Sequence, residues 1–400
     1  MVLTKQGEAQ EQSTERGRVA VGIDPSRSAL QIALLFPGRG SPRSHRLPLE
    51  PASVNKLDEL LEGRKATFAI EGAASVGQLF LLELLNQGHD LREVHPKVSK
   101  SVREMFTEDH TDKKDASGLA YAVRFVPSLP SIGLSSEQAA AKRLSRLRER
   151  LVRDRTRHIN RLHACLTETY GAVYHQFFRE LSSKKALCFF KQYPSLNDVL
   201  ANPEEVRKKI GYKAWQAVKT IGKWTDGAYM RVLRREVAVL VDVILELKRQ
   251  VDEIEKEMEA PPWGKDIEVL ASMPGLGTII AGTILGNTGD LSRFKNQDTY
   301  AAYCGLAPAS WQSGASETRS KRRSRYNRHL KRAFLCLALT QIRVSPEARE
   351  YYSRKRKEGK THWAALRALA RQLCRIVFIM LRRAQPYSHQ TTNTSLPLDI

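Results

Sequence analysis

The sequence is poor in cysteine and lacks long apolar runs. It contains five cysteines and ten histidines in 400 residues, and neither set has the spacing of a zinc site or another metal motif. Free buried thiols in a reducing cytosol are therefore expected. No uninterrupted apolar stretch reaches the length of about 20 residues that a membrane-spanning helix needs, so we expect no membrane partner.

Acidic residues are also in deficit, with 43 Asp and Glu against 65 Lys and Arg, which gives a formal net charge of +22. Such a charge predicts attraction to polyanions and binding that weakens in salt. Charge alone leaves a ribosomal or a membrane-surface protein open. The polar stretch 1–17 lacks the apolar core of a signal peptide. We expect it to be a disordered tail, as we do residues 386–400.

At 400 residues the chain is long enough for two or three domains, and a hydrophobic content of 42% supports a core in each. Between residues 18 and 130, apolar runs alternate with helical patterns, and this predicts an α/β layer architecture. We expect strands at Val19–Asp24, Ala29–Phe36, Thr67–Glu71 and Leu91–Val94, and helices at Val76–Asn86, Ser99–Phe106 and Asp112–Val123.

Residues 131–260 are expected to form a helical region with two long helices, Glu137–Thr169 and Tyr229–Met258. In the second helix the apolar residues alternate steps of four and three, which is the heptad seam of a coiled coil or of a long antiparallel hairpin. Ordinary helices of a compact bundle are the alternative. A shorter helix is expected around Pro203–Ile210.

Residues 261–385 are expected to form a mainly α-helical C-terminal domain. The turn Pro274-Gly275-Leu276-Gly277 separates two helical patterns. It fits a helix-hairpin-helix, in which backbone N–H groups face a phosphate, and it fits a simple helix–helix corner equally well. Two further helices are expected within Ser345–Arg383.

Four carboxylates stand where a metal site could form. Asp24 and Glu71 each end an apolar strand, and α/β sheets bind ligands at the carboxyl ends of their strands. Asp112 and Asp115 are three residues apart, so a helix would present them on one face. Converging carboxylates suit two Mg²⁺ ions about 4 Å apart, which can clamp the attacking and leaving oxygens of a phosphodiester. Taken singly, Asp24 or Asp112 could instead cap a turn or a helix.

A serine in a small-residue loop is the candidate nucleophile. Ser313 and Gly314 lie in the segment Trp311–Ser316, whose small residues would let a phosphate backbone approach closely. A serine hydroxyl there could attack phosphorus and form a covalent ester with nucleic acid. On chemistry alone, an ordinary Ser-Gly turn is the favoured alternative.

A run of basic residues follows this loop, and only Glu317 opposes it. Solvated helix faces usually mix charges of both signs, so a phosphate-contacting surface is the better interpretation. The candidate nucleic-acid-binding residues are Arg319, Lys321, Arg322, Arg323, Arg325, Asn327, Arg328, Lys331 and Arg332.

The chain resembles, over nearly its whole length, the DEDD-type transposases of bacterial insertion sequences, which are described as bridge-RNA-guided recombinases. The resemblance rests on motifs that follow one another in the family's order: Val21-Gly22-Ile23-Asp24, Ile70-Glu71-Gly72, Thr111–Ala116, Met273–Gly277, Gly289–Phe294, Tyr303–Pro308, Ser313-Gly314, Asn327 and Leu330-Lys331.

The resemblance implies a RuvC-like, RNase H-fold N-terminal domain and a C-terminal serine transposase domain. It maps the family's nucleophile onto Ser313, with Ser316 as the competing candidate and Ser310 as a weaker one. Ala315 and Ser316 depart from the family's pattern, which commonly has a second glycine and then lysine or arginine at these two positions.

The expected function is that of a Mg²⁺-dependent DNA recombinase with a 5′-phosphoserine intermediate. The implied partners are donor and target DNA, a structured bridge RNA, and further copies of the chain, as a dimer that assembles into a tetramer through the long helices. The implied location is the bacterial cytoplasm, at the nucleoid. A Holliday-junction-type nuclease in which water attacks, and a non-catalytic nucleic-acid scaffold, are the alternatives.

Overall fold

The chain divides into two compact units. Residues 1–140, 265–276 and 283–400 belong to one unit, and residues 141–264 and 277–282 to the other. The structure, a computed structural model, describes residues 17–71, 77–127, 129–133, 135–260, 264–307, 309–311, 319–321 and 326–388. The predicted terminal tails lie almost wholly outside the described residues.

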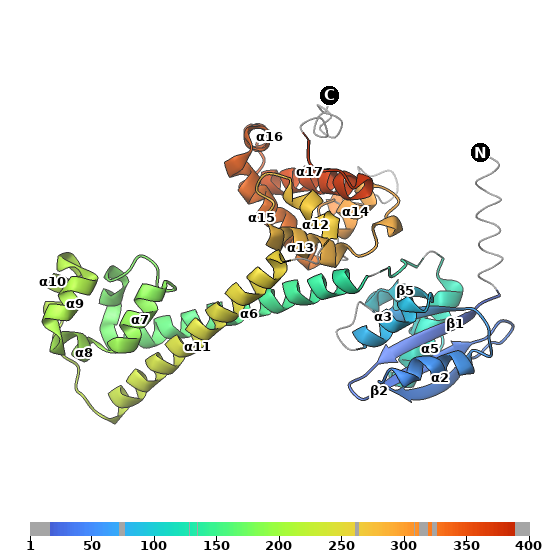
Figure 1. The fold of residues 1–400 in the computed structure, drawn as a ribbon, viewed down its shortest axis with the longest axis horizontal. Helices are drawn as coiled ribbons and strands as arrows, with labels where there is room; N and C mark the ends of the chain where they lie inside the picture. Colours follow the sequence, from blue (N-terminus) through green and yellow to red (C-terminus); the bar gives the residue numbers. More distant parts are fainter. Residues whose placement is uncertain are drawn as a thin grey trace. The chain divides into compact units, whose positions relative to one another are not determined.

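A five-stranded mixed sheet organises the N-terminal segment (Figure 1). Its strand order is β3-β2-β1-β4-β5. Strand β2 pairs antiparallel with both β1 and β3, and β4 pairs parallel with both β1 and β5. The strands are β1 (Val19–Pro25), β2 (Ala29–Leu35), β3 (Arg43–Pro48), β4 (Ala66–Glu71) and β5 (Asp90–Val94).

The four predicted strands are confirmed, but the sequence analysis missed β3. This edge strand reads Arg-Ser-His-Arg-Leu-Pro and has no buried residue, so it carries no apolar signal. Charged side chains and proline are typical of an edge strand, where they discourage pairing with another chain.

Helices cover both faces of the sheet (Figure 1). On one face, large residues such as Phe68 and Ile70 pack against α2 (Ala52–Leu60), which was not predicted, and α3 (Gln78–Asn86). On the other face, small residues such as Ala20 and Ala69 pack against α4 (Pro96–Glu104) and α5 (Asp112–Phe125). Successive residues of a strand point to opposite faces, so Asp24 shares the α5 face with Ala20.

Gly22 lets α5 lie directly on β1. A Cβ atom at this position would stand 2.0 Å from the carbonyl oxygen of Ala116 and 2.6 Å from the backbone nitrogen of Ala120. No larger residue fits without moving the helix, because both neighbours are backbone atoms. The glycine therefore sets where the first turn of α5 meets the end of β1.

The second unit is helical. Two long helices, α6 (Ser136–Tyr170) and α11 (Ala228–Glu259), run antiparallel, with Arg148 paired to Glu255 and Tyr229 bonded to Glu168. Between them in sequence lie the short segments η1 (Gly171–Gln176), α7 (Lys184–Gln192), α8 (Leu196–Ala201), α9 (Pro203–Ile210) and α10 (Tyr212–Lys219).

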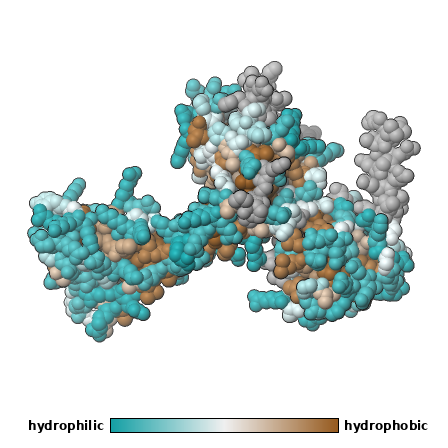
Figure 2. Space-filling view, in the orientation of Figure 1, coloured by the Kyte–Doolittle hydropathy of each residue, from teal (hydrophilic) through white to brown (hydrophobic). Residues whose placement is uncertain are grey.

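The heptad seam of α11 faces inward. Leu233, Val237, Leu240, Ile244, Val251 and Ile254 are buried, and several of them join a large core with aromatic residues of η1 and α7. The visible surface of this unit is largely hydrophilic with apolar patches (Figure 2), and Tyr229, Val232 and Val239 of α11 are exposed. The seam is therefore filled by this chain's own side chains, while a coiled coil that joins two copies stays a prediction.

The C-terminal segment is mainly helical, as expected, with one small hairpin that was not predicted. Two of its helices meet at the corner that the sequence predicts, where Gly275 has φ 76° and would clash with Thr340 if it carried a side chain. Its elements are α12 (Gly264–Ala271), α13 (Thr278–Thr288), η2 (Leu291–Arg293), α14 (Gln297–Tyr303), β6 (Ala309–Trp311), β7 (Arg319–Lys321), α15 (Arg328–Val344), α16 (Pro346–Lys357) and α17 (His362–Arg383).

Among the helices that the structure describes, none combines the length and apolar character needed to cross a membrane.

Candidate metal and catalytic site

Two of the predicted carboxylates come from neighbouring parallel strands. Ile23 in β1 pairs with Ile70 in β4, and Asp24 and Glu71 are the next residues of their strands. Adjacent strands lie about 4.8 Å apart, and by alternation both carboxylates project toward the face that α4 and α5 cover. The sheet register therefore places Asp24 beside Glu71.

The other two carboxylates lie in the first turn of α5. Thr111 is the N-cap residue, and its hydroxyl accepts a hydrogen bond from the backbone of Lys114 at 3.3 Å. A helix N-terminus carries a partial positive charge, which favours carboxylates such as Asp112 and Asp115 at that end. Because Gly22 seats α5 on β1, this turn lies near the end of the strand that carries Asp24.

The pKa of Asp24 reflects the nearness of the other three carboxylates. Its pKa is raised from 3.8 to about 6, first by burial and then by the negative charges of Asp112, Asp115 and Glu71, while His110 acts in the opposite direction. Like charges raise the pKa of a carboxyl because each disfavours ionisation of the others. All four predicted residues therefore share one electrostatic environment.

Helix α4 contacts two of these carboxylates. The hydroxyl of Ser99 donates to Oε2 of Glu71 at 2.6 Å, and the guanidinium of Arg103 forms an ion pair with Oδ1 of Asp115. Nδ1 of His110 lies 3.2 Å from the other oxygen, Oδ2, of Asp115.

The sequence analysis missed Ser99, Arg103 and His110. Helical spacing places Ser99 and Arg103 on one face with Val102, but only the structure shows that this face is buried. A serine and an arginine on the inward face of a helix indicate polar partners inside.

The donor set fits a hard divalent cation. Mg²⁺ prefers carboxylate oxygens. An added cation would offset the negative charges that, after burial, raise the pKa of Asp24. As the side chains stand, however, no group of three or more His, Cys, Asp or Glu within the described part of the chain is close enough to hold a metal ion. The four carboxylates would therefore have to adopt other rotamers to enclose a cation.

The predicted nucleophile lies outside the described residues, as do Ser316, Arg322, Arg323 and Arg325. The backbones of Ser310, in β6, and of Arg319 and Lys321, in β7, are described, and these two strands pair antiparallel.

The described end of the basic run opens α15. Asn327 is the N-cap residue and accepts hydrogen bonds from the backbones of His329 and Leu330. Its amide nitrogen lies 3.3 Å from the hydroxyl of Tyr303, so its contacts are within the protein. Arg328 and Arg332 are exposed, and the ammonium of Lys331 lies 4.4 Å from the ring centre of Tyr326. Their binding to nucleic acid remains a prediction.

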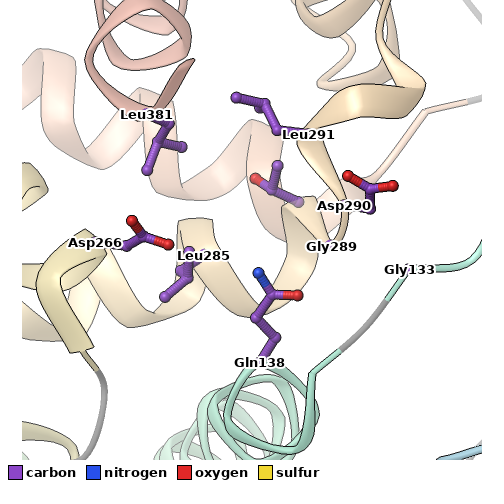
Figure 3. Close-up of a pocket in the computed structure, with 9 residues that line it drawn as sticks. Gly133, Gln138, Asp266, Leu285, Gly289, Asp290, Leu291 and Leu381 are labelled. Atoms are coloured by element: carbon purple, nitrogen blue, oxygen red, sulfur yellow. The ribbon is translucent and has the colours of Figure 1, made fainter. Parts of the chain in front are cut away.

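A separate cavity of about 290 Å³ lies among other residues of the first unit. Gln138, Asp266 and Asp290 line it together with Leu285 and Leu381 (Figure 3). None of the four predicted carboxylates borders this cavity.

Two models of transposase families match parts of this chain. The model of the DEDD transposase of IS110 elements matches residues 21–171, which include all four carboxylates. The model of the IS116/IS110/IS902 transposase family matches residues 267–353, which include the serine loop and the basic run.

Three relatives are similar to most of this chain. The uncharacterized 42 kDa protein of insertion element IS900 from Mycobacterium paratuberculosis is 29% identical over 359 residues, which cover 86% of this chain and 89% of the relative. The uncharacterized 43.6 kDa protein of insertion element IS110 from Streptomyces coelicolor is 27% identical, covering 92% and 95%. The transposase for insertion sequence element IS1328 from Yersinia enterocolitica is 25% identical, covering 80% and 85%.

Proposed function

We propose that this chain, a DEDD transposase of the IS110/IS116/IS902 family, cleaves and exchanges DNA strands with an acidic metal-binding site and a serine nucleophile. A transposase acts on DNA, and the matched DEDD domain implies an RNase H-like fold, with which the mixed sheet agrees. DEDD transposase domains generally use divalent metal ions.

The observation that carries the proposal is the convergence of Asp24, Glu71, Asp112 and Asp115 by strand register and by the seating of α5 on Gly22. Without a cation, four carboxylates would repel a phosphodiester. Bound Mg²⁺ would neutralise that charge and act as a Lewis acid toward the phosphoryl oxygens. These four carboxylates, the acidic quartet, would hold the cation and thereby keep the phosphate beside it.

In the proposed reaction, Oγ of Ser313 attacks a DNA phosphorus atom. A serine–phosphorus ester forms, the bond from phosphorus to the 3′ oxygen breaks, and that oxygen takes up a proton to leave a free 3′-OH. The 3′-OH of the partner strand then attacks the phosphoserine, which rejoins DNA and restores the serine. Each step exchanges one ester bond for another, so the reaction needs no external energy source.

We further propose that a structured bridge RNA from the element selects donor and target DNA. The net charge of +22 supports binding of an RNA as well as DNA through their backbones. Assembly as a dimer and then a tetramer, with the serine domain of one protomer completing the acidic site of another, belongs to the same proposal. Because the α11 seam is buried within the chain, a dimer would have to use other faces of the long helices.

The competing function is a metal-dependent nuclease in which water attacks, which needs the quartet but no serine. The two functions differ in whether protein becomes joined to DNA. Incubation with labelled nicked DNA and Mg²⁺, followed by a denaturing gel, separates them. We expect an adduct that Ser313→Ala abolishes and the matched control Ser316→Ala retains.

Cleavage that persists in Ser313→Ala without any adduct would favour the nuclease. Cleavage that survives Asp24→Ala would contradict both functions, because both depend on the acidic quartet.

A further inference from the structure

Helix α4 lies against the acidic cluster through two polar residues one helical turn apart. Ser99 and Arg103 are 6% and 8% exposed, and residues four apart on a helix lie on the same face. Each contacts a different carboxylate of the quartet, Glu71 for Ser99 and Asp115 for Arg103. The two contacted carboxylates come from a strand end and from a different helix.

Close packing fixes the position of α4. A Cβ atom on Gly118 in α5 would stand 3.1 Å from the Cβ of Arg103, so the two helices approach closely at this point. Val102 packs with Leu119 and with Ala69 of β4 in one core cluster. At the start of α4, Nδ1 of His95 accepts a hydrogen bond from the backbone of Lys97 at 3.1 Å. Ser99 and Arg103 are therefore held by the fold before any ligand binds.

Each contact occupies only one side of a carboxylate. Ser99 bonds Oε2 of Glu71, and Arg103 bonds Oδ1 of Asp115, so neither residue blocks the second oxygen of its carboxylate. Nδ1 of the exposed His110 lies 3.2 Å from that second oxygen of Asp115 and would have to move aside for a metal ion. Groups that bond the far side of a metal-binding carboxylate fix its direction, and their loss typically weakens metal binding about 10- to 100-fold.

We propose that α4 is a positioning element for the acidic site, in which Ser99 orients Glu71 and Arg103 orients Asp115 toward a divalent cation shared with Asp24. This inference rests on the proposed function, since it takes the quartet as the metal site. Ser99 and Arg103 are positioning residues, because they act through Glu71 and Asp115 and not on DNA.

Substitution of Arg103 distinguishes a positioning role from a purely electrostatic role, because the two roles predict opposite changes in cation affinity. Removing a positive charge next to a cation site strengthens cation binding on electrostatic grounds alone. Loss of orientation weakens it. Weaker binding in Arg103→Met would therefore come from Asp115 and not from the lost charge.

The experiment measures binding of Mn²⁺ alone to the full chain, by electron paramagnetic resonance of the free ion. We expect Ser99→Ala to raise the Kd about 10-fold or more, and Ser99→Thr, which keeps the hydroxyl, to stay within about 2-fold of wild type. Ser101→Ala is the matched control, because Ser101 is exposed on the same helix and bonds only the carbonyl of Lys97. Arg103→Met should also weaken binding.

A second readout separates orientation from general damage to the fold. Excess metal should restore DNA cleavage by Ser99→Ala to near the wild-type rate. The variant loses the orientation of Glu71 but keeps every reacting group. If Arg103→Met fails to fold, the comparison of Ser99→Ala with Ser99→Thr decides the question alone.

Wild-type affinity in Ser99→Ala, with binding lost in Asp24→Asn, would overturn the role of α4 and leave the metal site standing. Absence of Mn²⁺ binding by the wild-type chain, or binding unaffected by Asp24→Asn, would instead overturn the proposed metal site.

Discussion

Replacing Asp24 with asparagine should stabilise the metal-free N-terminal sheet while it removes function. The folded protein holds the pKa of Asp24 at about 6, against 3.8 without the fold. A charged Asp24 therefore opposes folding above pH 6, and this penalty fades as the pH falls through 6 toward 4. Asparagine has nearly the same shape and no charge, so the variant escapes the penalty.

The size of the effect follows from the shift. About two pKa units correspond to about 3 kcal/mol, but Asp24 is only partly buried, so solvent screening reduces this figure to about 1–2 kcal/mol. Such a change alters the ratio of folded to unfolded molecules about 5- to 30-fold. The chain has two units, so a local measurement is more informative than a global melting temperature.

The assay is amide hydrogen exchange of peptides from β1 and β4 in the presence of a chelator, with variant and wild type compared at the same pH. At pH 8 we expect slower exchange in Asp24→Asn by the factor above, and at pH 4 little difference. Asp109→Asn, an exposed residue just before α5, is the matched control and should match wild type. Mg²⁺ should then slow exchange in wild type and not in Asp24→Asn.

Faster or unchanged exchange in Asp24→Asn at pH 8 would refute the reasoning. It would mean that burial and the neighbouring carboxylates do not disfavour a charged Asp24 in the folded chain.

Three further predictions follow from other contacts. Asp115→Asn should destabilise the sheet and helices, whereas Asp24→Asn stabilises them, because it leaves Arg103 buried without its ion pair. We expect a loss of about 2–3 kcal/mol, seen as faster exchange of α4 and α5 peptides; unchanged exchange would show that the pair contributes nothing. Gly22→Ala should cost about 2 kcal/mol or more and lower the melting temperature, because its Cβ meets the backbone of α5, whereas Gly40→Ala, with open space around it, should not. Arg328→Ala combined with Lys331→Ala should reduce the slope of log K for DNA binding against log salt by about 2, as measured by fluorescence anisotropy in a salt series; an unchanged slope would exclude these residues from phosphate contact.

The apolar patterns made most of the N-terminal fold predictable. Val19–Asp24 and Thr67–Glu71 carry continuous apolar runs that end in a carboxylate, and both strands are present with that residue at or near the carboxyl end. The edge strand β3 was not predictable in the same way, because its residues are polar and unburied. The other edge strand, β5, was predicted because two of its residues, Leu91 and Val94, are apolar and buried, so strand prediction from apolar runs misses only a strand without such residues.

The acidic cluster was predictable as a set of residues, whereas its supports were not. Asp112 and Asp115 can be recognised by their spacing and by their place at the start of a helix. Ser99 and Arg103 acquire their role only when α4 packs on α5, which depends on Gly118 and Val102. Likewise, a heptad pattern marks the apolar face of α11 but does not say whether its own chain or a second copy covers that face.

The central claim is that Ser313 becomes covalently joined to DNA at a site served by the acidic quartet. The most direct measurement is mass spectrometry of the protein–DNA adduct after digestion of both the DNA and the chain. The account predicts a peptide containing residues 312–318 that carries a nucleotide through a 5′ phosphate on Ser313, present with Mg²⁺ and absent in Asp24→Asn. An adduct on Ser316 or Ser310, or full strand cleavage with no modified peptide, would contradict it.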